Sequence, residues 1–151
     1  MRLRTLTLLR AVGLVLCLLA WALAAVGLSA CSSGSSREAR GTVVRVTVRD
    51  FHIKLEPARI PAGDARLVIV NKGPDTHELL VVRGDSALPL RKDGLTVDED
   101  TIEPATLATA EGEPPGATEV LRLRLRRGHY ELFCNMAGHY LGGMSARLVV
   151  E

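Results

Sequence analysis

Residues 128–144 read Gly-His-Tyr-Glu-Leu-Phe-Cys-Asn-Met-Ala-Gly-His-Tyr-Leu-Gly-Gly-Met, a strand pattern followed by three side chains that bind soft metals. Segment 129–134 predicts a strand that ends at Cys134, and the glycines after it predict tight bends that present His139 and return the chain at Met144. Four residues separate Cys134 from His139, and four separate His139 from Met144. A thiolate, an imidazole and a thioether on one loop favour copper over magnesium, calcium or manganese.

Most of the chain around this loop also reads as strands. Apolar and polar residues alternate from Thr42 onward and again over 121–125, as expected for strands with one buried face. Further short candidates, bounded by turn-forming residues, are 66–70, 78–83 and 145–150. Six or seven strands without any sustained helical period predict an all-β fold, either an antiparallel sandwich or a small barrel.

One segment departs from this pattern. Residues 84–118 contain four prolines and many acids and show no alternation. We expect a long connection there, with a short helical turn at 97–102. Its acidic part, 93–113, has the charge to steer a basic partner, although surface acids more often serve solubility alone.

A trigonal copper site needs a second histidine, and His77 is the candidate. It lies in the turn Asn71-Lys72-Gly73-Pro74-Asp75-Thr76-His77-Glu78 between two apolar strands, where it can face the far loop across one end of a sandwich. Other interpretations stay open at this point. Each residue taken singly has an ordinary structural role, a Cys/His catalytic pair would lack a third residue to orient the base, and zinc would leave the thioether unexplained.

The first thirty residues predict a secretion signal. Three arginines precede an apolar run, and the tetrapeptide Leu28-Ser29-Ala30-Cys31 resembles the cleavage motif of bacterial lipoproteins. We therefore expect residues 1–30 to be removed, Cys31 to carry lipid, and residues 31–41 to form a flexible tether. These features predict a protein anchored to the cell membrane on its extracytoplasmic side. With the signal's arginines set aside, the near-neutral remainder gives no reason to expect nucleic acid as a partner.

The domain 42–151 resembles the blue copper proteins, or cupredoxins, of the rusticyanin and sulfocyanin kind. The spacing of Cys134, His139 and Met144 carries the resemblance, supported by the Asn-Lys-Gly turn that leads to His77. The resemblance implies a Greek-key β-sandwich of about six to eight strands and one mononuclear type 1 copper. It implies a plane of His77, Cys134 and His139, with Met144 as the weak axial ligand. Asn71 and Glu78 are the expected outer residues of the site.

Glu78 departs from the family pattern. The residue after the first histidine is Asn or Ser in several cupredoxins, where it bonds toward the cysteine loop, and here it is glutamate. The departure bears on the hydrogen bonding of the thiolate, and therefore on the reduction potential.

The expected function is transfer of single electrons between transient redox partners, by a monomer that is not an enzyme. Four histidines in the whole chain are too few for the additional copper sites of a multicopper oxidase or a copper nitrite reductase. A copper-binding lipoprotein that stores, scavenges or delivers copper is the alternative, since it would use much the same soft ligands.

Overall fold

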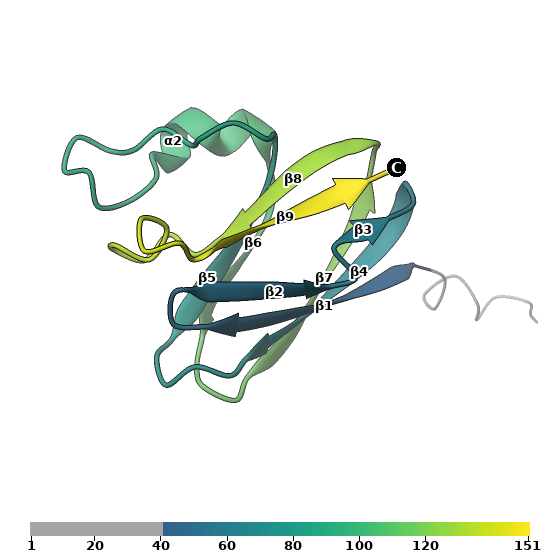
Figure 1. The fold of residues 1–151 in the computed structure, drawn as a ribbon, viewed down its shortest axis with the longest axis horizontal. Coiled ribbons are helices and arrows are strands. Elements are labelled where there is room, and N and C mark those ends of the chain that lie inside the picture. Colours follow the sequence, from purple (N-terminus) through teal and green to yellow (C-terminus); the bar gives the residue numbers. More distant parts are fainter. Residues whose placement is uncertain (1–40) are drawn as a thin grey trace, which may run out of the picture. The chain divides into compact units, whose positions relative to one another are not determined.

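The computed structural model describes residues 41–151, which belong to one compact unit, residues 39–151 (Figure 1). The predicted signal 1–30, the lipidated Cys31 and the tether up to residue 40 lie outside the described residues, so that division of the chain stays a prediction. Within residues 41–151, no helix is long and apolar enough to cross a membrane.

Within residues 41–151, nine strands form two sheets. The first sheet has the order β2-β1-β4-β7 and the second has the order β3-β9-β8-β5-β6. The strands of the first sheet are β1 (Thr42–Arg49), β2 (His52–Glu56), β4 (Gly63–Asn71) and β7 (Thr118–Leu125). Those of the second are β3 (Arg59–Ile60), β5 (His77–Arg83), β6 (Thr106–Glu113), β8 (Gly128–Phe133) and β9 (Ser145–Val150). The predicted all-β sandwich is confirmed.

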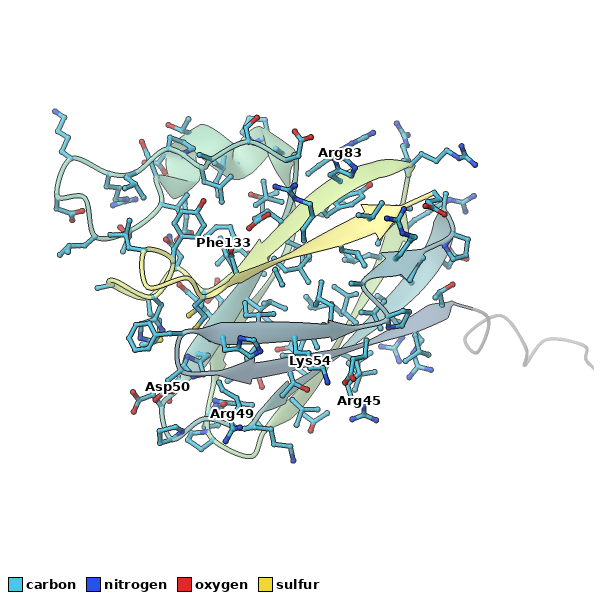
Figure 2. The ribbon with its side chains drawn as sticks, viewed as in Figure 1. Arg45, Arg49, Asp50, Lys54, Arg83 and Phe133 are labelled. Carbon is cyan, nitrogen blue, oxygen red and sulfur yellow. The ribbon has the colours of Figure 1, made fainter. Side chains whose placement is uncertain are left out.

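The core between the sheets follows from the alternation in the sequence. In β1, the valines at 44, 46 and 48 are buried, whereas Arg45 and Arg49 point to solvent, as Figure 2 shows for the two arginines. The core is aliphatic apart from Tyr130 and the sulfur-containing Cys134 and Met144. The Tyr130 hydroxyl donates a hydrogen bond to the carbonyl of Arg126 at 2.8 Å. Burial of alternate aliphatic side chains from both sheets provides the main favourable term for this fold.

A second, smaller core lies under the acidic segment. It consists of Leu80, Val82, Val97, Ile102 and Phe133. The segment contains a short helix, α2 (Glu99–Ile102), followed by the 3₁₀ turn Glu103–Ala105. Ile102 anchors this helical pair on the second sheet, and the helical turn predicted at 97–102 falls within two residues of it.

The acidic segment also contains a strand that the sequence does not predict. β6 occupies Thr106–Glu113 and pairs antiparallel with β5. The long connection expected over 84–118 is therefore wrong in its second half. The small residues of β6 give little hydrophobic alternation, and only Ala110 is fully buried. Because the strand is at the sheet edge, backbone pairing with β5 defines it more than side-chain burial does.

The strand ends place three connections at one end of the sandwich. These are the Asp50-Phe51 turn of the β1–β2 hairpin, the β4–β5 turn, and the loop between β8 and β9, drawn in yellow in Figure 1. The contacts described below show that all three meet. In Figure 2, Asp50 is labelled at this end of the hairpin.

Candidate metal centre

The loop between β8 and β9 is held by its own backbone. The Cys134 N–H donates to the Met144 carbonyl at 3.1 Å, and the Met144 N–H donates to the His139 carbonyl at 3.0 Å. Between them, the Gly142 N–H donates to the Gly138 carbonyl at 2.9 Å. The loop therefore presents the three predicted ligand residues from one compact turn, as the glycine positions predict.

His77, which the sequence placed in a turn, is the first residue of β5 and reaches this loop from the end of the β4–β5 turn. Candidate ligand atoms of His77, Cys134 and His139 all lie within 4.8 Å of one another. The Cys134 Sγ lies 3.4 Å from Nδ1 of His139, and the two imidazole centroids are 5.3 Å apart. The structure thus brings together the histidine predicted from the turn and the two ligands predicted from the loop.

Three of the four predicted ligand residues are sealed from solvent. His77, Cys134 and Met144 are each 0% exposed, whereas His139 is partly exposed. Met144 is fixed beside the other ligands by the two main-chain hydrogen bonds that tie it to Cys134 and His139. His139 is consequently the one predicted ligand with an edge at the protein surface.

An unsatisfied nitrogen indicates that the site is built for a metal. Within residues 41–151, Nδ1 of His77 is buried and has no hydrogen-bond partner, while Nε2 of the same ring lies 3.0 Å from Oδ1 of Asp50. Leaving a buried polar atom unpaired costs about 1–3 kcal/mol. A metal held by Nδ1 would remove that cost, so the residues fit a bound ion.

The Cys134 thiol has an environment that resists ionisation without a metal. Burial raises its pKa, and the nearby charge of Glu78 adds a smaller increase. Main-chain hydrogen bonds from Glu78 and Met136 oppose the rise. Because the thiolate is the metal ligand, metal binding must displace a proton from Cys134, and the two main-chain donors then stabilise the thiolate.

Glu78, the residue that departs from the family pattern, takes part in the hydrogen bonding around Cys134. Its half-buried carboxylate has a raised pKa, first because of burial and then because of repulsion by Glu99. A hydrogen bond from the Asn135 main chain works against this rise. Glu78 therefore bonds toward the cysteine loop with its side chain and supports the thiolate with its main chain.

Asn71 holds the turn that carries His77. Its side chain is fully buried and accepts a hydrogen bond from the Gly73 N–H at 2.8 Å. It donates to the carbonyls of Asp75 at 2.8 Å and Glu113 at 2.7 Å. Asn71 therefore holds the ligand turn together and ties it to β6.

The sequence pattern does not predict two residues that lie next to the ligands. Asp50 contacts His77, and the ring of Phe51 packs against that of His139 with centroids 5.1 Å apart. The only sequence signal was their position between two alternating strands, 42–49 and 52–56, which marks a hairpin turn. The sequence around this turn does not show that it contacts His77, which lies 27 residues further along the chain, or the still more distant β8–β9 loop.

Comparison with solved structures identifies proteins with the same fold. Reduced auracyanin from the photosynthetic bacterium Roseiflexus castenholzii matches with a TM-score of 0.59 at 17% identity, covering 74% of this chain and 98% of that one. Auracyanin B matches with a TM-score of 0.56 at 26% identity, covering 73% and 88%. The chain has a cupredoxin-like fold.

A third solved structure shares this fold. Reduced rusticyanin matches with a TM-score of 0.54 at 17% identity, covering 74% of this chain and 81% of that one. No protein-family model and no curated protein sequence matches this chain significantly. Its donor set, two imidazoles and a thiolate with a buried thioether, is that of a mononuclear type 1 copper site.

Proposed function

We propose that this protein carries single electrons between redox partners at the outer face of the cell membrane. The observation that carries the proposal is the distribution of burial over the ligands: three are sealed in the core, and only His139 has an edge at the surface. Copper, when bound, supplies the one-electron couple. With four protein donors there is no open position for a substrate, which supports a carrier rather than an enzyme.

The protein's role is to hold the ligands still. All three connections at this end of the sandwich are tied by hydrogen bonds to strands or to each other. A ligand set that keeps its positions in both oxidation states leaves little to reorganise when an electron arrives or departs. Because Cys134 and Met144 are fully buried, water does not reach their sulfur atoms.

The surface beside His139 suits weak docking. Phe51 is 52% exposed and Leu141 is 53% exposed, and both lie close to the imidazole in space or along the loop. Leu95, also exposed, adjoins the loop because its carbonyl accepts a hydrogen bond from the Gly138 N–H at 2.9 Å. A small apolar patch of this kind fits the brief encounters of redox proteins.

Spectroscopy of the copper-loaded full chain in detergent tests the electron-carrier proposal. We expect an intense visible thiolate-to-copper band that ascorbate bleaches as Cu(II) gains an electron, and that ferricyanide restores with the copper still bound. Cys134→Ser should abolish the band. A colourless Cu(II) form, or release of copper on reduction, would support copper storage or delivery instead.

The membrane location requires a separate experiment because it depends on Cys31. In a bacterial host, we expect the wild-type chain in the membrane fraction, with an N-terminal peptide that begins at a lipid-modified Cys31. Cys31→Ala should lose the modification. An unmodified wild-type N-terminus at Met1 would contradict the lipid anchor and leave the copper site untouched.

A further inference from the structure

The two ring nitrogens of His77 lie in different surroundings. Nε2 faces Oδ1 of Asp50 at 3.0 Å, whereas Nδ1 is buried without a hydrogen-bond partner in the described part of the chain. The ring itself is 0% exposed, and the Asp50 side chain is 32% exposed. The contact spans 27 residues, from the β1–β2 turn to the first residue of β5.

Gly73 provides the space in which this contact forms. A Cβ atom at Gly73 would lie 2.8 Å from Oδ1 of Asp50 and 2.9 Å from Nε2 of His77. It would also lie 3.1 Å from the Asp50 main-chain nitrogen. A side chain at this position would therefore force the carboxylate and the imidazole apart. The turn accommodates the pair, and the Asn71 side chain fixes Gly73 over it.

We propose that Asp50 is a positioning residue for the copper ligand His77. By accepting a hydrogen bond from the Nε2–H group, Asp50 selects the tautomer whose Nδ1 lone pair faces Cys134 and His139. Its negative charge, carried through the imidazole, also stabilises the oxidised copper relative to the reduced copper and so lowers the reduction potential. This second effect rests on the type 1 site of the proposed function, whereas the choice of tautomer does not.

Elementary chemistry supports both effects. A neutral imidazole has one protonated and one free nitrogen, and a hydrogen bond at one nitrogen decides which form is present. A carboxylate on the distal nitrogen orients a metal-binding ring and makes it a stronger donor, and loss of such a partner costs about 10- to 100-fold in metal affinity. Since Asp50 is only partly exposed, solvent screens its charge incompletely.

Three variants of the full chain separate the effects. Asp50→Asn keeps an oxygen acceptor but removes the charge, and Asp50→Ala removes both. Gly73→Ala leaves Asp50 in place but separates it from His77. The matched control is Asp75→Asn, which removes an exposed carboxylate on the turn that leads to His77. The His77 ring pairs with the carboxylate of Asp50 and not with that of Asp75 among the described residues.

The first measurement is nitrogen-15 NMR of the His77 ring in the metal-free full chain. We expect the Nε2–H tautomer in the wild type and in Asp50→Asn. We expect a mixture of tautomers in Asp50→Ala and Gly73→Ala. A mixture in the wild type, or an unchanged tautomer in Asp50→Ala and Gly73→Ala, would overturn the positioning role.

The second measurement uses the copper-loaded chain. We expect the reduction potential of Asp50→Asn to shift upward by more than that of Asp75→Asn, and Cu(II) affinity to fall about 10- to 100-fold in Asp50→Ala. Equal shifts in Asp50→Asn and Asp75→Asn would overturn the charge effect. If the wild-type copper form is colourless, the electron-carrier proposal fails, and the metal-free NMR result still decides the positioning role.

Discussion

Phe51 packs across the imidazole of His139, with ring centroids 5.1 Å apart and ring planes tilted by 54°. Phe51 adopts a φ of 57°, the only positive φ of a non-glycine residue among the described residues. The loop opposite is adapted to it, because a Cβ at Gly142 would lie 2.2 Å from the Phe51 Cδ1. A strained backbone and a glycine in the facing loop therefore combine to keep one aromatic ring on the exposed ligand.

Two replacements of Phe51 separate the effect of its strained backbone from the effect of its aromatic ring. Phe51→Ala and Phe51→Gly both uncover His139, but only glycine relieves the left-handed backbone. We expect Phe51→Gly to be more stable than Phe51→Ala, with a free energy of unfolding about 1 kcal/mol larger. Urea denaturation of the two metal-free chains measures the difference. Equal stabilities would show that residue 51 is not strained in solution.

The axial position is tested by Met144→Leu, with Met136→Leu as the matched control. Met144 is fully buried, whereas Met136 is 38% exposed on the same loop. Leucine fills a similar volume, so we expect Met144→Leu to cost less than about 1.5 kcal/mol and to retain copper. Loss of the sulfur donor should raise the reduction potential, because the oxidised metal loses a ligand. Voltammetry giving the same potential for Met144→Leu and Met136→Leu would exclude Met144 as a ligand.

The turn that carries His77 depends on Asn71. Its buried amide makes three hydrogen bonds, and Asn71→Ala would leave the Gly73 N–H and two carbonyls without those partners. We expect a loss of roughly 2–4 kcal/mol in the free energy of unfolding of the metal-free chain. Thr76→Ala is an exposed control on the same turn. An Asn71→Ala chain as stable as Thr76→Ala would show that the amide does not anchor the turn.

Features with a local physical origin can be predicted from the sequence, and features that depend on distant contacts cannot. Strands such as β1 and β7 alternate strongly because one face is buried, so pattern alone locates them. The ligand loop is local, and its spacing within 134–144 carries its chemistry. By contrast, β6 is defined by backbone pairing at an edge, and Asp50 acts on His77 across 27 residues. Such long-range contacts depend on the assembled fold, which no local pattern encodes.

A pair of carboxyl groups, one on β6 and one on β7, predicts a pH dependence of stability. Glu113 at the end of β6 hydrogen-bonds the Glu119 side chain in β7, and this contact, with burial, raises the pKa of Glu113 to about 7 from 4.5. The folded chain thus binds a proton that the unfolded chain releases. This contribution is fully present below pH 4.5 and is lost as the pH rises through about 7.

Glu113→Gln tests the linkage, because glutamine can donate to Glu119 at any pH. Relative to this variant, the metal-free wild type should lose stability between pH 5 and pH 8, values that lie on either side of the raised pKa of about 7. Glu111→Gln, at an exposed site on the same strand, should follow the wild type. Denaturation curves at the two pH values give the comparison. A constant difference between the wild type and Glu113→Gln at both values would mean that the two carboxyl groups share no proton in the folded chain.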